Sequence, residues 1–385
     1  MTGAAHIVLI HWTMPPAVGG SESHVADVAA ALAAAGRQVT VITGEQHALP
    51  VPGCRTISVD TLRFDRLWHH RGASSELEDE LYAELGIVLA ALSPDVVHAH
   101  NLHQIRPEPA RALARLRADL RLVVHHTFHC HALWPAGAAL DPGVFTAWDA
   151  NYVLSAFVHT ELARLDMPTT LLPSGVDVGR FRSRRPCLRA AAPPVLLHPA
   201  RLVPEKGADV SLAALRALRA DGVAAKLIIA DGPTPDWDDV IGPYRHGLAA
   251  AVARWGLAEA VEFRRLPYRD MPGAYEEADI VLYPVRWDEP LGLVPLEAMS
   301  ARRPVVASRC GGITGTVRHT STGYLVPPGD WRAVARRIRW LLRHPDEARR
   351  TARRAHREVR ATHDLTVHVA DLLRRYDLTC RTAAG

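Results

Sequence analysis

The sequence predicts an α/β protein of two successive domains, each a doubly wound parallel sheet with helices on both faces. At 385 residues the chain is longer than one ordinary core supports, which favours two domains of roughly 150 to 200 residues. Short β-branched runs alternate with longer Ala-, Leu- and Arg-rich segments, and this alternation restarts near residue 195. Residues 179–194, polar and rich in Arg and Pro, are interpreted as the linker. We expect domains at 1–183 and 184–385 that face each other across a cleft.

The first domain begins with an apolar run, AHIVLIH, at residues 5–11, which predicts a buried strand rather than a signal peptide because no basic segment precedes it. The remaining elements follow the same alternation. Further strands are expected at about 38–43, 95–99, 121–126, 151–155 and 169–172, and amphipathic helices at about 21–35, 75–92, 107–118 and 157–166.

The second domain repeats the pattern from the run VLLHP onward. Strands are expected at about 195–199, 225–230, 260–263, 280–283, 304–307 and 324–326, with helices between them. Two or three Arg-rich helices close the chain between about 331 and 377, and the last can cross back to the first domain. Ligands of such sheets bind at the carboxyl ends of the strands.

Composition and charge exclude several classes of protein. No apolar run approaches the roughly 20 residues that cross a bilayer, and five scattered cysteines argue against a disulfide framework or a zinc site and for the cytoplasm. Residues 1–185 carry a net charge of −3 and the remainder +7, out of +4 in total. A basic second half suits a phosphate-bearing ligand, although a solvated basic surface remains an alternative. An acidic first half disfavours binding of nucleic acid or of anionic lipid.

The loop after the first strand contains two adjacent glycines, Gly19 and Gly20, where the first helix opens. Glycines let the backbone approach a ligand, and a helix N-terminus offers free N–H groups; Ser21 is a candidate cap. A tight turn without function explains this loop equally well.

The first strand of the second domain leads into Arg201 and Lys206. Both cations follow the carboxyl end of a strand, where a diphosphate would lie; Arg provides a bidentate fork and Lys a compact charge. Only two lysines occur in the chain, Lys206 and Lys226, which draws attention to the first of them. The sequence therefore favours phosphate binding here.

The segment EPLGLVPLE places Glu289 and Glu297 eight residues apart. On a continuous helix they would differ by about 80° in azimuth and about 12 Å along the axis, so they could reach opposite ends of an extended ligand. Gly292, Leu293 and Val294 would present N–H groups to an anion at the helix N-terminus. A nucleotide-sugar has this layout of sugar, diphosphate and ribose.

Four segments, GGSE, ARLVPEKG, EPLGLVPLE and GYLVPPGD, resemble in order and spacing the motifs of retaining GT-B glycosyltransferases of family 4. The turn LPSGVD at 172–177 adds to the resemblance, which covers Ile7 to about Leu373. It implies two Rossmann-like domains, the first for the acceptor and the second for the nucleotide-sugar donor. It also implies sugar transfer without a metal or other cofactor.

The resemblance also implies residue roles. Arg201 and Lys206 would hold the donor diphosphate, Glu289 the transferred sugar, and Glu297 the ribose. His129, after Thr127 at a strand end, would lie beside the reacting sugar. The amides of residues 292–294 would face the phosphate or sugar, and Gly19 and Gly20 would approach the phosphates across the cleft.

The sequence departs from the family pattern at several positions. Cys130 stands where an Asp is usual, and Gly315 takes the place of the acid in a "GG-x-x-E" motif. Arg265 and Arg302 replace common glycines. These departures leave the identity of the base and the details of sugar recognition open.

Many histidines follow two neighbouring strands of the first domain: His98, His100, His103, His125, His126, His129 and His131. Pairs on one face could chelate a metal, but no carboxylate or Cys completes a set, so we expect no metal site. We expect these imidazoles to line the acceptor side of the cleft instead.

We therefore expect a retaining, metal-independent hexosyltransferase that takes a UDP-sugar in preference to a GDP-sugar. We expect a small soluble acceptor, for which an aminocyclitol or another natural-product core of antibiotic and secondary metabolism is a candidate. A lipid or polysaccharide acceptor, another enzyme on the same framework, and a non-catalytic sugar-nucleotide-binding protein remain alternatives.

Overall fold

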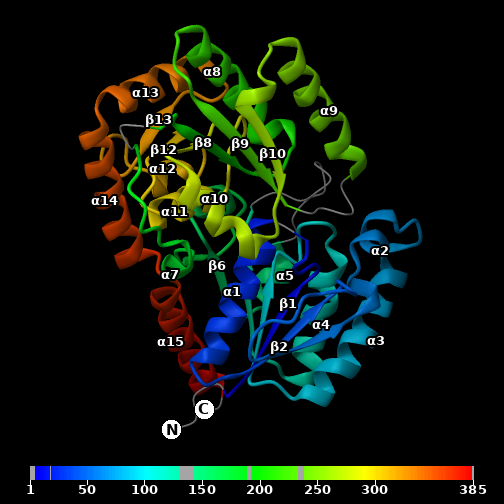
Figure 1. Ribbon diagram of the computed structural model, residues 1–385. Coiled ribbons are helices and arrows are strands. Elements are labelled where there is room, and N and C mark those ends of the chain that lie inside the picture. The colour runs from blue at the N-terminus through cyan, green and yellow to red at the C-terminus, as the bar shows by residue number, and fades with distance from the viewer. Residues whose placement is uncertain (1–4, 18, 131–141, 189–191, 233–237, 384–385) are drawn as a thin grey trace. The chain divides into compact units, whose positions relative to one another are not determined.

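The computed structural model describes residues 5–17, 19–130, 142–188, 192–232 and 238–383 (Figure 1). The chain divides into two compact units, one of Met1–Gly175 with Leu365–Gly385 and the other of Val176–Asp364. Each unit contains a fully parallel sheet. The predicted fold class, two doubly wound α/β domains, is confirmed.

The sheet of the first unit has seven strands in the order β3-β2-β1-β4-β5-β6-β7. The strands are β1 (His6–His11), β2 (Gln38–Thr43), β3 (Cys54–Ser58), β4 (Val96–His100), β5 (Val124–Phe128), β6 (Ala150–Val153) and β7 (Thr170–Leu171). The order reverses between β1 and β4, and ligands of doubly wound sheets bind at the carboxyl ends of the strands beside such a reversal.

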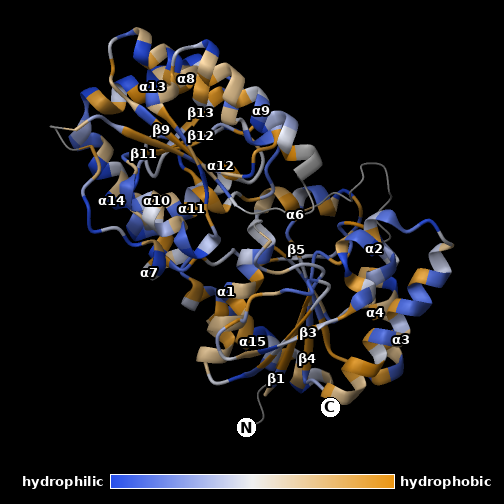
Figure 2. Ribbon diagram, turned by 45° about the vertical axis from the view of Figure 1, so that its right-hand side comes forward, coloured by the Kyte–Doolittle hydropathy of each residue, from blue (hydrophilic) through white to orange (hydrophobic). Residues whose placement is uncertain are grey.

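Helices cover both faces of this sheet, because successive side chains of a strand point to opposite sides. Along β1, Val8 and Ile10 belong to one core, while Ile7 and Leu9 belong to the other. The helices are α1 (Gly20–Ala34), α2 (Phe64–His69), α3 (Ser74–Leu92), α4 (Glu108–Leu120), α5 (Pro142–Thr146), α6 (Ala156–Ala163) and α15 (Leu365–Ala383). Figure 2 shows the strands as mainly hydrophobic and helices such as α3 as mixed.

The last helix, α15, belongs to the first unit although it comes from the end of the chain. Leu365, Val369, Leu372 and Tyr376 lie in the same core as α1, and α1 and α15 lie side by side (Figure 1). This burial explains why the chain returns to the first unit at residue 365.

The sheet of the second unit has six strands in the order β10-β9-β8-β11-β12-β13. The strands are β8 (Val195–Pro199), β9 (Lys226–Asp231), β10 (Val261–Arg265), β11 (Ile280–Tyr283), β12 (Val305–Ser308) and β13 (Tyr324–Val326). The helices are α7 (Val178–Phe181), α8 (Ala208–Ala220), α9 (Asp238–Arg254), α10 (Met271–Glu277), α11 (Leu293–Ser300), α12 (Ile313–Thr316), α13 (Trp331–Arg343) and α14 (Pro345–Thr362). The order reverses between β8 and β11.

The chain crosses between units at residues 175 and 176, rather than between 183 and 184 as expected. The stretch interpreted as a linker is bonded within the second unit. The backbone N–H of Leu188 donates to Asp279 (2.8 Å), and Arg349 donates to the carbonyl oxygens of Cys187 and Leu188. The described part of this stretch therefore belongs to the second unit.

Four of the short elements named above were not expected from the sequence: β3, α2, α5 and α7. The five cysteines are free thiols, as expected. No helix in the described part of the chain has the length and hydrophobicity needed to cross a membrane.

Candidate functional site

The carboxyl end of β8 leads into a tight turn that carries Lys206. Gly207 follows with φ +74°, and a Cβ atom at this position would lie 2.2 Å from the carbonyl oxygen of Pro284. A glycine is therefore needed for the turn to pack against the segment after β11. This packing brings Lys206 to the strand-order reversal between β8 and β11, where the sequence placed a phosphate site.

Lys206 and Glu289 form a buried ion pair. The Nζ of Lys206 lies 2.6 Å from Oε2 of Glu289, and the two residues are only 8% and 9% exposed. The indole N–H of Trp287 donates to the same oxygen (2.7 Å), and Lys206 also donates to the Tyr283 hydroxyl (3.3 Å). The sequence predicted both charged residues but not that they pair, and it missed Trp287 and Tyr283.

Burial and neighbouring charges shift the acid–base properties of this cluster. Burial lowers the pKa of Lys206, the carboxylate of Glu289 partly opposes this shift, and the nearby charge of Arg201 adds to it. Burial and Glu289 raise the pKa of the Tyr283 hydroxyl well above its usual range. Arg201 also acts on Tyr283, so both predicted phosphate ligands lie within electrostatic range of one cluster.

The loop that carries Glu289 rests on two glycines, Gly311 and Gly312. The N–H of Gly312 donates to the carbonyl oxygen of Glu289 (2.7 Å). A Cβ at Gly311 would lie 2.3 Å from that oxygen, and one at Gly312 would lie 2.1 Å from the carbonyl oxygen of Pro290. This motif lacks the usual acid at Gly315, but its two glycines allow the close backbone contact that positions Glu289.

Helix α11 begins at Leu293, after Gly292 with φ +80°. The first-turn N–H groups of Leu293 and Val294 have no acceptor within the helix, as at the start of any helix, and the anion site there stays a prediction. Glu289 precedes this helix, because residues 289–292 are not helical. The azimuth and rise of a continuous helix therefore do not describe its spacing from Glu297.

Glu297 lies on the second turn of α11 and is 6% exposed. Its carboxylate accepts a hydrogen bond from the Tyr275 hydroxyl, whose pKa is raised well above its usual range by burial and by Glu297. Tyr275, like Tyr283, was not identified from the sequence as a residue of the proposed site.

One departure from the family pattern has a conformational consequence. Arg302 has φ +55°, in the left-handed region that glycine adopts without strain. The common glycine at this position therefore fits the turn after α11, and Arg302 adopts the same turn at some cost.

In the first unit, Gly19 precedes α1 in an extended conformation, with φ −155°. A Cβ at Gly19 would lie 2.2 Å from Oε2 of Glu22, so this carboxylate folds over the glycine. Ser21 donates to Glu22 (2.9 Å) and is not the N-cap residue. The helix N-terminus thus already has a carboxylate beside it, and phosphate contact by Gly19 and Gly20 stays a prediction.

His129 follows β5 and is partly buried. Its Nε2 lies 3.0 Å from Nδ1 of His100, and its backbone N–H donates to Oδ1 of Asn101 (2.8 Å). Burial, with His24 and His100, lowers the pKa of His129 well below its usual range, so its imidazole is neutral at pH 7. Asn101 was not identified from the sequence, although its φ of +50° at a strand end is typical of functional loops.

Most of the other histidines do not line a surface, contrary to expectation. His98, His103, His125 and His126 are at most 1% exposed. The His98 ring bonds the hydroxyls of Tyr376 (2.5 Å) and Thr127 (2.8 Å), and His125 bonds Thr379 and Tyr152. His98 and His125 therefore hold α15 on the sheet. His131, also expected to line the cleft, lies outside the described residues.

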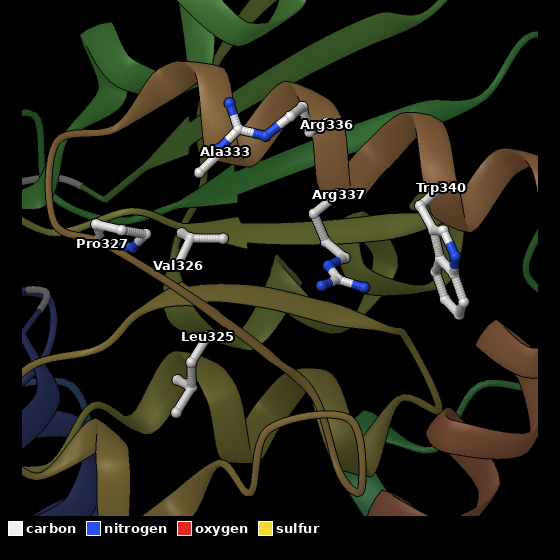
Figure 3. Close-up of a pocket in the computed structure, with 7 residues that line it drawn as sticks. All are labelled: Leu325, Val326, Pro327, Ala333, Arg336, Arg337 and Trp340. Carbon is white, nitrogen blue, oxygen red and sulfur yellow. The ribbon is translucent and has the colours of Figure 1, made fainter.

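Among the described residues, no group of three or more His, Cys, Asp or Glu side chains could hold a metal ion. A pocket of about 330 Å³ lies between β13 and α13 (Figure 3). Its lining residues, none of which was predicted to bind the donor, are Leu325, Val326, Pro327, Ala333, Arg336, Arg337 and Trp340. The Arg337 guanidinium lies over the rings of Tyr324 and Trp340 and is thereby engaged.

Two family models match adjoining parts of the chain. The model "Glycosyltransferase Family 4" matches residues 18–180, and "Glycosyl transferases group 1" matches residues 180–358. In fold, the chain is similar to the sucrose-phosphate synthase of Thermosynechococcus elongatus, with a TM-score of 0.78, 24% identity, and 99% and 100% of the two chains covered.

Three relatives illustrate the range of similar proteins. A glycogen synthase of Mycobacterium tuberculosis is 31% identical over 93% of this chain and 91% of its own length. A GDP-mannose-dependent phosphatidylinositol monomannoside mannosyltransferase of Mycolicibacterium smegmatis is 35% identical over 61% and 64%. An α-D-kanosaminyltransferase of Streptomyces kanamyceticus is 31% identical over 42% and 40%.

Proposed function

The chain belongs to the GT-B glycosyltransferases of family 4, and from this premise we propose a retaining, metal-independent transfer from a nucleoside diphosphate sugar. The sugar is a hexose or aminohexose, and the favoured donor is a UDP-sugar. The observation that carries this proposal is the buried pair of Lys206 and Glu289 at the strand-order reversal of the second unit.

The pair of Lys206 and Glu289 suits a nucleotide-sugar donor, because different parts of the donor can replace the contact that the two side chains make with each other. A diphosphate would take the ammonium of Lys206 together with the guanidinium of Arg201. Glu289, held by Trp287, would then accept hydrogen bonds from sugar hydroxyls. The first-turn N–H groups of Leu293 and Val294 would add a second partner for anionic oxygens, and Glu297 remains the proposed ribose ligand.

Retention follows in this proposal from attack on the face that the leaving group occupies. The acceptor oxygen bonds to the anomeric carbon as the bond from that carbon to the phosphate oxygen breaks. The acceptor proton passes to an oxygen of the departing diphosphate, so no enzyme carboxylate needs to act as a nucleophile. Lys206 and Arg201 stabilise the charge that develops on the diphosphate, and His129 orients the sugar. These fixed cations take the role that a divalent ion would otherwise have.

For the acceptor we propose a small soluble polyhydroxy compound, with an aminocyclitol as the first candidate. The net charge of −3 over residues 1–185 favours a cationic acceptor, and the kanosaminyltransferase relative supports a natural-product role. The glycogen synthase and mannosyltransferase relatives favour the alternative, a glycan or lipid acceptor.

The proposal is tested by incubating the purified protein with UDP-, GDP- and ADP-sugars and measuring slow release of the nucleotide. Aminocyclitols, short α-glucans and phosphatidylinositol mannosides are then added in turn. Stimulation by an aminocyclitol supports the acceptor proposal, whereas stimulation only by a glucan or lipid replaces it. No release and no binding of any nucleotide-sugar would refute the donor proposal.

A further inference from the structure

His100 and His129 lie at the carboxyl ends of neighbouring strands in the first unit. His100 ends β4, which pairs in parallel with β5, and His129 comes directly after β5. The Nδ1 atom of His100 is 3.0 Å from the Nε2 atom of His129, a distance at which one nitrogen must donate and the other accept. The two imidazoles therefore cannot choose their tautomers independently.

Both rings are neutral, which limits the pair to two arrangements. Burial, followed by the neighbouring imidazoles, lowers the pKa of each ring well below its usual range. A neutral imidazole carries one N–H. Either His100 donates from Nδ1 and leaves its Nε2 bare, or His129 donates from Nε2 and His100 carries its proton on Nε2.

The surroundings of His100 separate these arrangements. Its Nε2 is buried and, within the described residues, has no hydrogen-bond partner. The ring stacks on that of His98 with centroids 4.3 Å apart. With its proton on Nε2, His100 would bury its only N–H without an acceptor, which is rare in proteins, whereas with its proton on Nδ1 it donates to His129. The arrangement with a bare Nε2 on His100 is therefore favoured, and it leaves the proton of His129 on Nδ1.

We propose that His100 is a positioning residue that fixes His129 as its Nδ1–H tautomer. His129 then offers a hydrogen-bond donor, rather than a base, to a hydroxyl of the bound sugar or acceptor. Asn101 completes the arrangement through the backbone, because its Oδ1 accepts from the N–H of His129 while its Nδ2 donates to Gln104 (3.0 Å). The identity of the ligand that His129 contacts rests on the proposed function, but the assignment of the His129 tautomer does not.

The tautomer can be observed directly in the full-length protein labelled with ¹⁵N-histidine. Two-bond ¹H–¹⁵N correlation spectra distinguish protonated from bare ring nitrogens, and the signals that vanish in His129→Asn identify His129. We expect a protonated Nδ1 and a bare Nε2 in the wild-type protein. A protonated Nε2 would overturn the proposal, and this spectrum requires no variant of His100.

Two substitutions of His100 test its effect on His129. His100→Phe keeps a ring but removes the hydrogen bond, so we expect a mixture of tautomers and about a tenfold lower kcat with unchanged donor affinity. His100→Asn keeps an N–H near the position of Nδ1, so we expect the original tautomer and a kcat within about twofold of wild type. An unchanged tautomer in a folded His100→Phe protein would contradict the proposal.

The outcomes also separate this inference from the proposed function. If the spectra are as expected but the wild-type protein cleaves no nucleotide-sugar, the pairing stands and the proposed transfer fails. If the protein transfers sugar but His129 carries its proton on Nε2, the pairing fails and the transfer stands.

Discussion

Lys206 and Glu289 form a buried ion pair, and a bound donor would compete for both partners. Removing one member of a buried pair leaves the other charge uncompensated, typically at about 3–5 kcal/mol. A single substitution at the proposed donor site is therefore expected to destabilise the second unit as well as to weaken donor binding. Lower turnover of a Lys206 variant could come from lost stability or from lost donor binding, so the melting temperature and the donor affinity must both be measured.

Replacement of Lys206 or Arg201 by Ala should weaken donor binding or turnover at least tenfold. A charge-assisted contact to a diphosphate is worth about 1.5–3 kcal/mol, and about 1.4 kcal/mol corresponds to one decade. Calorimetric titration of each folded variant with UDP-sugar measures the effect. Lys226→Ala is the matched control, because the only other lysine is exposed at the amino end of β9. Equal affinities in all three variants would mean that the donor binds elsewhere.

Replacement of His129 by Ala should reduce turnover by roughly a hundredfold, within the range of a positioned catalytic side chain. Nucleotide affinity should change little, because the predicted nucleotide contacts are the backbone of Gly19 and Gly20 and residues of the second unit, and His129 is not among them. Steady-state kinetics and thermal melting of the same preparation separate the two effects. A lower melting temperature with unchanged turnover per folded molecule would assign His129 to the scaffold.

At the scale of elements, the N-cap glycine of α12, Gly312, and a glycine within this helix, Gly315, provide a controlled comparison. Gly312→Ala would place a Cβ 2.1 Å from the carbonyl oxygen of Pro290 and displace the Glu289 loop, whereas at Gly315 nothing lies within 4 Å. Neither glycine has a positive φ, so the difference is steric. We expect Gly312→Ala to lower donor turnover at least tenfold and Gly315→Ala to leave it nearly unchanged. Equal activities of the two variants would show that Glu289 does not depend on this contact.

The attachment of α15 should depend on pH. Burial lowers the pKa of His24 to about 3 and of His125 to about 4, from an ordinary value of 6.5. The unfolded chain thus binds more protons than the folded one, so stability is lost as pH falls from 6.5 toward 4. Each such imidazole loses about 2 kcal/mol between pH 6.5 and 5. Hydrogen exchange should show α15 opening more readily at pH 5 than at 7.5, and equal protection at both would contradict this.

Sequence patterns predicted every strand of the two sheets except β3. The strand β1 has six buried residues, and its apolar run is visible in the sequence. The edge strand β3, CRTIS, has no fully buried residue and no apolar run, so it gave no comparable signal. Burial alone does not explain the difference, because β10 has no fully buried residue either and was predicted. The pattern records apolar runs, and not strand formation itself.

The residues of the proposed site stand out in the sequence, but their contacts do not. Lys206 and Glu289 are 83 positions apart, and no local pattern reveals that they pair or that Trp287 shares the same oxygen. The role of Gly311 and Gly312 depends on backbone atoms 22 or more positions away, at residues 289 and 290. Contacts of this kind arise from the meeting of strand ends across the sheet, which motif spacing does not describe.

At the scale of the whole molecule, we propose that the chain cleaves a nucleoside diphosphate sugar with retention and without a metal. Time-resolved ¹H NMR of UDP-α-hexose hydrolysis in excess EDTA tests stereochemistry and metal dependence in one experiment. We expect the wild-type protein to release the α-anomer first, before spontaneous mutarotation, and Lys206→Ala to release it at least ten times more slowly. Initial release of the β-anomer, or cleavage that begins only when a divalent ion is added in excess of the chelator, would contradict the claim.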